Sequence, residues 1–312
     1  VVELDARNTG PREVLALHRV LRTRGIDAIY ADTPRDLRLA AYATLLRRCP
    51  IAYRYNTAMK TPRGDFGDLM FARAVGALVT LSAWVEEEVR RREPWLAARP
   101  IHRIPNGFDL ELLRPVPEQG AVLRARLGLD PGTPTVLCAS VFARGKRQEF
   151  LLEVLGRLRQ QGRPVVCLLA GGTEVQATFR GQAEAFGVEV RWLGRPAPEE
   201  LPAIYAGADV VAQPCAIETF GNVVGEAMAC ERAVVVPDAG AAPEVAGDAG
   251  VIVPAADVER WAIEIGQLLA DPARRSALGR SARERVAGAF PLQRMQGAHV
   301  ALFERLAAVG RS

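Results

Sequence analysis

The residues best suited to chemistry lie in the stretch Pro214–Pro237, PCAIETFGNVVGEAMACERAVVVP. A loop carries Glu218, Phe220 and Gly221 open a predicted helix, and Glu226 lies within that helix. A helix N-terminus offers unpaired N–H groups and positive potential to phosphate. Carboxylates accept hydrogen bonds from sugar hydroxyls. The pattern therefore predicts a site for a polyhydroxylated anion, although the two acids taken alone also fit a general acid/base pair.

Apolar runs that alternate with amphipathic segments supply the scaffold for these residues. In the first part, strands are predicted over 1–4, 26–33, 50–56, 77–82 and 101–107, and helices over 12–25, 36–49, 69–76 and 82–93, the last with Ser82 as N-cap. In the second part, strands are predicted over 135–140, 164–172, 188–194, 208–214, 233–237 and 249–254, with helices between and after them. Such alternation predicts the α/β class, with parallel sheets and helices on both faces.

Proline and glycine residues loosen the pattern over 112–134, which predicts an inter-domain connection. We expect a first domain over 1–115, a linker over 116–133 with a short helix at 121–128, and a second domain over 134–290. The final segment, 291–312, is predicted to be a helix that packs back toward the first domain.

Composition narrows the class of protein. The 312 residues are 49% hydrophobic and 24% charged, with no apolar run of membrane-spanning length. Five isolated cysteines in apolar runs are expected to be buried and reduced, which favours a cytoplasmic location. Three scattered histidines do not favour a His-based metal site.

Positive charge is concentrated in residues 1–115, whose net charge is +5, against −1 for residues 116–312. Arg90, Arg91 and Arg92 form a cluster that fits either a solvated helix face beside Glu86–Glu88 or a surface that meets anionic lipid or an anionic acceptor. Nucleic acid is not an expected partner, because basic and aromatic residues do not alternate. Peripheral contact with the inner membrane face through the first domain remains an open alternative.

Several segments together resemble the retaining glycosyltransferases of the GT-B fold, in the family-four type (glycosyl transferases group 1). ETFGNVVGE, from Glu218 to Glu226, keeps seven residues between the acids and continues in the family's order to Asp257. WLGRPAPEELPAIYAGADVVAQPC precedes it, and LVTLSAWVEEEV and IPNGFD resemble the end of the family's N-terminal domain. The resemblance implies two Rossmann-like domains that face each other across a cleft holding a nucleotide sugar. Family members begin with a further strand, Gly-rich loop and helix, so the first domain is expected to lack its opening β-α unit, as a shortened chain or a fragment.

The resemblance also implies roles for the residues of the opening stretch. Glu226 would bind the ribose hydroxyls, and Glu218 would face the donor sugar. Backbone groups of Phe220, Gly221 and Asn222 would contact the sugar and phosphate. The expected donor-binding residues at this loop and helix also include Thr219.

Lys146 is one of only two lysines in the chain and follows a predicted strand, where the family's lysine contacts the donor diphosphate. The family's Gly-Arg pair about five residues earlier is replaced by Ser140 and Val141. Arg144 or Arg147 would then take the place of the missing arginine.

Four further positions follow from the resemblance. Gly194 and Arg195 end a strand where the family contacts the base. Arg54 lies where the family has a cleft-facing histidine, and Asn106 lies at the domain junction. We place these last two on the acceptor side.

We therefore predict a retaining, metal-independent hexosyltransferase that uses a nucleoside diphosphate sugar, an acceptor hydroxyl and no cofactor. One alternative is a donor-binding protein impaired in catalysis, which the missing opening unit and the Ser140–Val141 departure motivate. The other is a sugar-nucleotide epimerase of the GT-B fold.

Overall fold

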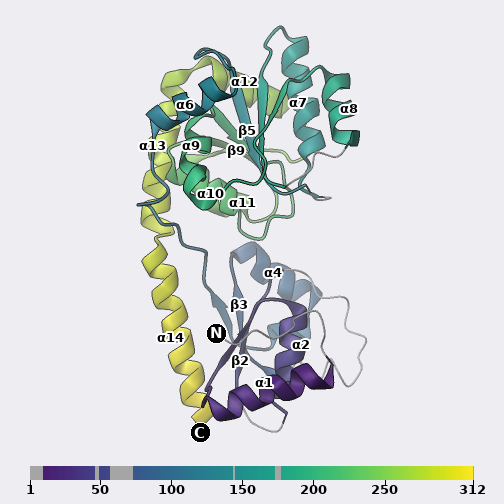
Figure 1. Cartoon of the computed structure of the whole chain (residues 1–312), viewed down its shortest axis with the longest axis vertical. Coiled ribbons are helices and arrows are strands. Elements are labelled where there is room, and N and C mark those ends of the chain that lie inside the picture. The colour runs from purple at the N-terminus through teal and green to yellow at the C-terminus, as the bar shows by residue number, and fades with distance from the viewer. Residues whose placement is uncertain (1–9, 46–48, 57–72, 143–144, 173–176, 312) are drawn as a thin grey trace. The chain divides into compact units, whose positions relative to one another are not determined.

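Two separate parallel sheets organise the chain in the computed structural model, which describes residues 10–45, 49–56, 73–142, 145–172 and 177–311 (Figure 1). The first sheet belongs to a unit made of residues 1–105 and 293–312. The second belongs to a unit made of residues 106–292. Neither sheet contains an antiparallel pair among the described residues, as the alternating sequence pattern predicts.

The first unit holds four strands in the order β1-β2-β3-β4. Their bounds are β1 (Ile29–Ala31), β2 (Ile51–Arg54), β3 (Val75–Thr80) and β4 (Ile101–Arg103). The helices before α14 are α1 (Pro11–Thr23), α2 (Pro34–Ala43), α4 (Ala83–Arg92) and α5 (Pro94–Ala97). The predicted N-cap Ser82 is confirmed, because its Oγ accepts a hydrogen bond from the N–H of Val85. The predicted strand over 1–4 and residues 69–72 of the predicted helix over 69–76 lie outside the described residues. The end of that predicted helix is wrong, because Val75 and Gly76 begin the strand β3, whose apolar run VGALV pairs with its neighbours in the sheet.

The arginines of α4 form ion pairs along the helix. Arg90 pairs with Glu86, and both Arg91 and Arg92 pair with Glu88, each at 2.6 Å. Of the two interpretations of this cluster, the solvated helix face is therefore the one that the contacts bear out.

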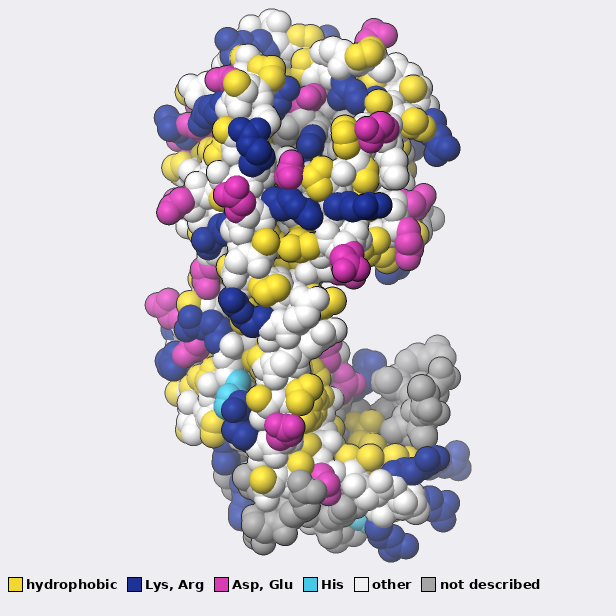
Figure 2. All heavy atoms as spheres, turned by 90° about the vertical axis from the view of Figure 1, so that its left-hand side faces the viewer, with side chains coloured by type: hydrophobic (Ala, Val, Ile, Leu, Met, Phe, Trp, Pro, Cys, Tyr) yellow, Lys and Arg dark blue, Asp and Glu magenta, His cyan; other side chains and the backbone are white. Residues whose placement is uncertain are grey.

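Other arginines of the first unit are exposed on α1 and α2. They are Arg12, Arg19, Arg22, Arg35 and Arg38. Figure 2 shows Lys and Arg side chains gathered at the lower right of the visible face. No helix within the described ranges combines the length and the apolar composition that crossing a membrane requires.

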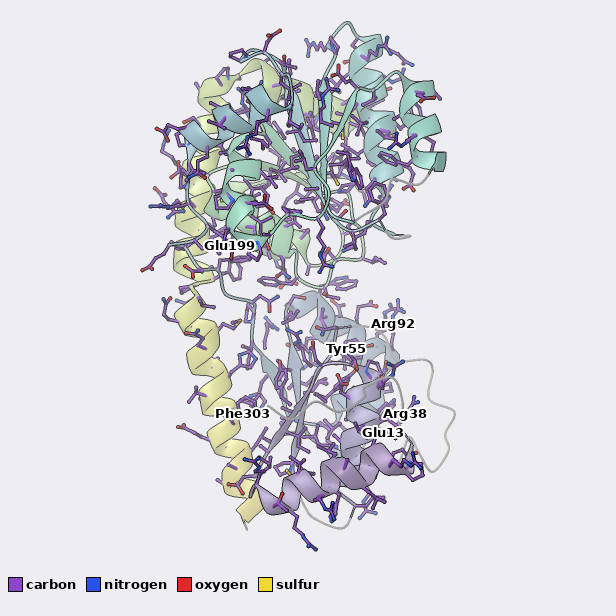
Figure 3. All side chains as sticks on the ribbon, in the orientation of Figure 1. Glu13, Arg38, Tyr55, Arg92, Glu199 and Phe303 are labelled. Atoms are coloured by element: carbon purple, nitrogen blue, oxygen red, sulfur yellow. The ribbon has the colours of Figure 1, made fainter. Side chains whose placement is uncertain are left out.

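The last helix, α14 (Leu292–Arg311), covers one face of the first sheet. Leu302 and Leu306 are buried against β2 and β3 in a cluster with Ala52, Ala77 and Val79. Phe303, labelled in Figure 3, lies against Tyr30 of β1 with 5.9 Å between ring centroids. These contacts assign the C-terminal helix to the first unit.

The second unit holds six strands in the order β10-β9-β8-β5-β6-β7. Their bounds are β5 (Thr135–Ala139), β6 (Val166–Ala170), β7 (Val190–Trp192), β8 (Val210–Ala212), β9 (Ala233–Pro237) and β10 (Val251–Val253). The helices are α6 (Pro117–Arg126), α7 (Gln148–Gln160), α8 (Ala177–Phe186), α9 (Leu201–Ala206), α10 (Asn222–Ala229), α11 (Ala242–Ala246), α12 (Val258–Ala270) and α13 (Pro272–Ala289), with 3₁₀ turns at Pro198–Glu200 and Gly247–Ala249. The chain runs from β5 outward to β7 and returns to the other side of β5 as β8. In open α/β sheets, ligands commonly bind at the carboxyl ends of the strands where the order reverses, which here are the ends of β5 and β8.

The predicted linker over 116–133 differs from the structure. The division between the units falls after Pro105, and α6 belongs to the second unit. Helix α6 packs so closely on α9 that a Cβ built on Gly120 would lie 2.5 Å from the carbonyl carbon of Ala206. Proline and glycine near 112–134 therefore mark turns and a close helix contact within the second unit.

All five cysteines are buried, as predicted from their apolar surroundings, and none of the five forms a disulfide. Three of them, Cys138, Cys167 and Cys215, lie on β5, on β6 and just after β8. Trp261 of α12 and Leu151 of α7 are fully buried on the same sheet. This core fixes the strand ends from which the candidate site is built.

Candidate functional site

Two loops leave the sheet where the strand order reverses, and they bring Lys146 and Glu218 together. Lys146 lies in the segment after β5, and Glu218 in the segment after β8. Lys146 Nζ donates a hydrogen bond to Glu218 Oε2 at 2.8 Å. Although 72 residues separate them in sequence, the direct pairing of β5 with β8 places their loops side by side.

The charge of Lys146 is maintained in this position. Burial alone would lower the pKa of its ammonium, but the hydrogen bond and the charge of Glu218 outweigh burial. The pKa of Lys146 is therefore raised, and a compact positive charge is available at neutral pH.

The turn after β9 packs against the Glu218 loop and holds it in place. The N–H of Ala241 donates to the Glu218 carbonyl at 2.9 Å. Gly240 has φ +67°, and a Cβ there would lie 3.0 Å from both the N and the O of Glu218. The loop thus requires glycine at position 240, for its conformation and for its close approach. Ile217, beside Glu218, is 65% exposed.

Helix α10 begins immediately after this loop and is fixed by aromatic packing. Its N-cap, Gly221, has φ +100° and no side-chain cap. Phe220 is buried and lies between Phe108 and Phe290, with ring centroids at 6.1 Å and 5.5 Å. The Phe108 ring also lies over Gly225, where an added Cβ would fall 2.0 Å from Cζ. The side chain of Phe220 is therefore part of the core, which leaves its backbone as the group that a ligand could contact.

Glu226 points from α10 toward α9. The hydroxyl of Tyr205, a fully buried residue of α9, donates to Glu226 Oε2 at 2.7 Å. Burial raises the pKa of Glu226, and the bond from Tyr205 opposes that rise. Tyr205 was not singled out from the sequence, because its only signal there is one aromatic residue at the end of an amphipathic helix.

Asn106 lies at the start of α10. Its Nδ2 donates to Asn222 Oδ1 at 2.8 Å, and both residues belong to the second unit. The prediction placed Asn106 on the acceptor side, whereas the structure places it beside the expected donor residues. The neighbouring N–H of Phe108 donates to the Phe290 carbonyl at 2.9 Å, so the two chain segments that lead to the first unit are joined next to α10.

Of the two candidates for the missing arginine, the structure describes only Arg147, and its guanidinium contacts lie away from Lys146. Arg144 lies outside the described residues. Arg147 Nη1 donates to the Ala255 carbonyl at 2.5 Å, and its guanidinium lies 4.3 Å above the Phe150 ring. Arg147 therefore serves a structural contact. Ser140 accepts a hydrogen bond from the buried Gln148, and Val141 is 54% exposed.

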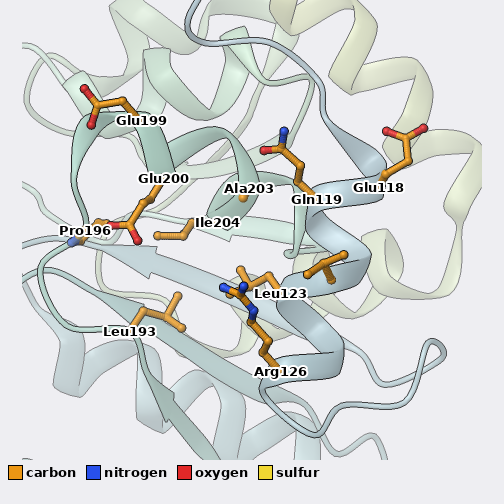
Figure 4. A pocket seen from close by; sticks show the side chains of 11 residues that line it. Glu118, Gln119, Leu123, Arg126, Leu193, Pro196, Glu199, Glu200, Ala203 and Ile204 are labelled. Atoms are coloured by element: carbon orange, nitrogen blue, oxygen red, sulfur yellow. The ribbon is translucent and has the colours of Figure 1, made fainter.

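Gly194 and Arg195 follow β7. The carbonyl of Gly194, a residue with φ +65°, accepts from the N–H of Gly171 at 2.6 Å, which joins the turns after β6 and β7. Arg195 is exposed. A hollow of about 450 Å³ lies nearby between α6 and α9, lined in part by Leu193 and Pro196 (Figure 4). None of the predicted site residues lines this hollow.

Arg54 belongs to the first unit, where it forms an ion pair with Asp32. Its Nη2 donates to Asp32 Oδ2 at 2.6 Å, and Asn56 Nδ2 donates to Oδ1 at 2.7 Å. The hydrogen bond from Arg54 lowers the pKa of Asp32. A polar cluster thus forms at the carboxyl ends of β1 and β2. Asp32 and Asn56 were not singled out from the sequence.

No group of three His, Cys, Asp or Glu side chains within the described ranges is arranged to hold a metal ion. The arrangement instead combines one ammonium, two carboxylates and a helix start. These groups are chemically suited to bind an anion that carries hydroxyl groups.

Two family models match the chain. The model of glycosyl transferases group 1 matches residues 121–285, and that of glycosyltransferase family 4 matches residues 4–112. These spans cover most of both units.

Curated relatives match at moderate identity. A GDP-mannose-dependent alpha-(1-6)-phosphatidylinositol monomannoside mannosyltransferase of Mycobacterium tuberculosis is 34% identical over 294 residues, which are 88% of this chain and 75% of that protein. Its counterpart of the same description from Mycolicibacterium smegmatis is 36% identical over 195 residues, which are 59% of this chain and only 50% of that protein.

A solved structure, sucrose-phosphate synthase from Thermosynechococcus elongatus, superimposes with a TM-score of 0.82 at 25% identity. The match covers 96% of this chain and 78% of that one.

Proposed function

Because the chain belongs to the glycosyl transferases group 1, we propose that it transfers a hexose from a nucleoside diphosphate sugar to an acceptor hydroxyl with retention of configuration. The predicted family, GT-B fold class and glycosyltransferase class are confirmed by the family match, the relatives and the structural likeness. Donor, acceptor, stereochemistry and residue roles are part of the proposal.

The observation that carries the proposal is the 2.8 Å contact of Lys146 with Glu218 at the strand ends where the order of the sheet reverses. Lys146 would stabilise the donor diphosphate and the charge that develops on it as the sugar leaves. The start of α10, near Gly221 and Asn222, would bind a phosphate through backbone N–H groups. Glu226 would bind the ribose, and Glu218 would face the sugar.

In the proposed mechanism, the acceptor oxygen attacks on the same face of the sugar as the leaving diphosphate. The leaving phosphate takes the acceptor's proton, and no protein nucleophile is used. The hydrogen bond from Lys146 engages Glu218 Oε2 and supports a positioning role for this carboxylate.

Metal independence is also proposed. Lys146 and the α10 start would supply the positive charge that a divalent cation provides in other transferases. Turnover with EDTA present should therefore equal turnover with added Mg²⁺ or Mn²⁺, and a requirement for either ion would contradict this part of the proposal.

GDP-mannose is the favoured donor, and an inositol-containing glycolipid the favoured acceptor, because the relatives in both mycobacterial species carry these names. A cytoplasmic location with peripheral contact at the inner membrane face would suit such an acceptor. The exposed arginines of α1 and α2, such as Arg19 and Arg22, support contact with anionic headgroups. Sedimentation with phosphatidylinositol vesicles, but not with phosphatidylcholine vesicles, is the expected result.

The test of the function is acceptor-dependent release of nucleoside diphosphate. The purified protein is incubated with GDP-mannose, UDP-glucose or ADP-glucose, each with and without phosphatidylinositol mannoside. We expect GDP release only when the acceptor is present, and an axial glycosidic bond in the product. Conversion of the donor to an isomeric sugar nucleotide without acceptor would instead support the epimerase alternative.

Donor binding without transfer is the second candidate. It is favoured by Ser140 and Val141 in place of the Gly-Arg pair and by the engagement of Arg147 with Ala255. A raised melting temperature with GDP-mannose, but no GDP release with any acceptor, would support it.

A further inference from the structure

Tyr205 places its one side-chain polar atom, the phenol oxygen, in the interior of the second unit. Its ring is fully buried at the end of α9, and its hydroxyl oxygen lies 2.7 Å from Glu226 Oε2. Burying a phenolic hydroxyl costs free energy unless it is hydrogen-bonded, so this bond satisfies Tyr205 as well as Glu226.

The geometry leaves the two oxygens of Glu226 in different states. Oε2 accepts from Tyr205, and no hydrogen bond to Oε1 occurs among the described residues. A carboxylate has about four acceptor positions, so one oxygen can stay on the phenol while the other meets a ligand. The bond also restricts rotation about the three side-chain torsions of Glu226.

We propose that Tyr205 is a positioning residue for donor binding: it fixes Glu226 through Oε2 and presents Oε1 to the ribose hydroxyls of the nucleotide sugar. The inference rests on the proposed function, because it assigns Glu226 to the donor. It adds a residue from α9, outside the ETFGNVVGE stretch, to the donor site.

The electrostatics of the pair agree with this geometry. Burial raises the pKa of Tyr205 well above its ordinary value, with the charge of Glu226 adding to the rise, so the phenol stays a donor. For Glu226, burial raises the pKa and the Tyr205 bond lowers it. The other titratable groups that influence the pair electrostatically are Cys230, which acts on both partners, and Cys138, which acts on Tyr205.

Loss of the phenol hydroxyl therefore has a consequence beyond packing. Without the bond from Tyr205, the pKa of Glu226 rises further, and the carboxylate is protonated at a higher pH. A protonated carboxyl loses acceptor capacity, so donor affinity should fall on acidification sooner than in the wild type.

The test variant is Tyr205→Phe, which keeps the ring and removes only the hydroxyl. The dissociation constant for GDP-mannose, or for whichever nucleotide sugar the wild type binds, is measured from pH 5 to pH 8. A lost hydrogen bond to a charged group predicts about ten-fold weaker binding at neutral pH. The acid limb of the affinity profile should move to higher pH, while kcat at saturating donor changes little.

Tyr53→Phe is the matched control. Tyr53 is also a fully buried tyrosine, but its hydroxyl has no hydrogen-bond partner among the described residues. Removal of that hydroxyl should leave donor affinity and its pH profile unchanged. A double variant with Glu226→Gln supplies a second measure. If Tyr205 acts through Glu226, the two losses in affinity will not add.

The outcomes separate the two proposals. Wild-type protein that binds none of the nucleotide sugars overturns the proposed function and with it the role of Tyr205. Wild-type binding with an unchanged constant and pH profile in a folded Tyr205→Phe overturns the positioning role alone. Additive losses in the double variant also overturn it.

Discussion

The two acids of the candidate site are held in opposite ways. Glu226 lies in a helix, its side chain is partly buried, and its partner is an uncharged phenol that packing fixes in place. Glu218 lies in a loop and binds Lys146, and the exposed fractions of these two side chains are 18% and 27%. The loop passes over Gly240, and its tip presents the exposed Ile217.

This contrast indicates which part of the site is ordered before a ligand binds. The Glu226 end is set by folding, because Tyr205, Phe108 and Asn106 contact three different residues of α10. The Glu218 end is an ion pair that an incoming diphosphate can compete with or share. A prearranged group is suited to binding, and a pair that can exchange partners is suited to respond during the reaction.

The largest effect on activity is expected from loss of the Lys146 ammonium, which pairs with Glu218. Lys146→Ala should lower kcat about 10²- to 10³-fold, because it removes a charge that stabilises the leaving group. Initial rates of GDP release at saturating donor and acceptor measure it. Arg180→Ala, an exposed cation on α8, is the control and should retain full activity. Comparable activity of both variants would remove Lys146 from the mechanism.

At the rigid end, Gly225→Ala should destabilise the second unit strongly. The added Cβ would lie 2.0 Å from Phe108 Cζ, so the ring or the helix must move. Overpacking of this kind costs about 1–3 kcal/mol, which urea unfolding measures directly. Gly181→Ala on α8 is the matched control, since nothing lies near its Cβ, and it should be neutral or stabilising. Equal stability of Gly225→Ala and wild type would contradict the described packing.

Gly240→Ala should disturb the loop that carries Glu218 and leave helix α10 unchanged. Position 240 has φ +67°, and the new Cβ would meet the backbone of Glu218 at 3.0 Å. Strain of about 1 kcal/mol is expected, with a larger effect on kcat than on donor affinity, since Glu218 moves and Glu226 does not. Gly128→Ala has the same φ with open space around it and controls for the strain alone. If Gly240→Ala loses donor affinity but keeps kcat, the loop and not the helix is the part that binds the donor.

The smallest effect concerns the stability cost of burying Glu226. Burial raises its pKa in the folded state above the ordinary value near 4.5. With respect to Glu226, the folded protein therefore has its full stability below that value, where Glu226 is protonated. It loses part of that stability as the pH rises through the folded pKa, because a charged carboxylate must then be buried. Glu226→Gln should raise the melting temperature by a few degrees at pH 7–8, and the gain should vanish near pH 4. A lower melting temperature at pH 8 would show that the carboxylate stabilises the fold.

The sequence predicted the elements of this site better than the contacts between them. Alternating apolar runs predicted parallel sheets, and the order of residues around Glu218 and Glu226 predicted a loop followed by a helix. The contact of Lys146 with Glu218 depends on which strand pairs with β5, and strand order leaves no local mark in a sequence. Tyr205 looks like any apolar residue of an amphipathic helix until α10 packs beside it.

The errors have a similar origin. Residues 116–133 contain the prolines and glycines of a linker, yet Gly120 allows α6 to pack against Ala206. Arg147 follows a strand, where a phosphate-binding arginine is expected, but its guanidinium is engaged by Ala255 and Phe150. In both cases the residue type fits two environments, and only tertiary packing decides between them.

The most direct test asks whether Glu226, and not Glu218, binds the nucleotide. It measures the affinity for free GDP by calorimetry in Glu226→Gln and in Glu218→Gln. GDP contains the ribose and the diphosphate but not the hexose that is transferred. Glu226→Gln should therefore weaken GDP binding at least about ten-fold. Glu218→Gln should leave GDP binding unchanged or tighter, because it removes a negative charge beside Lys146 and the diphosphate. Weaker GDP binding in Glu218→Gln together with unchanged binding in Glu226→Gln would contradict the assignment of the rigid acid to the nucleotide.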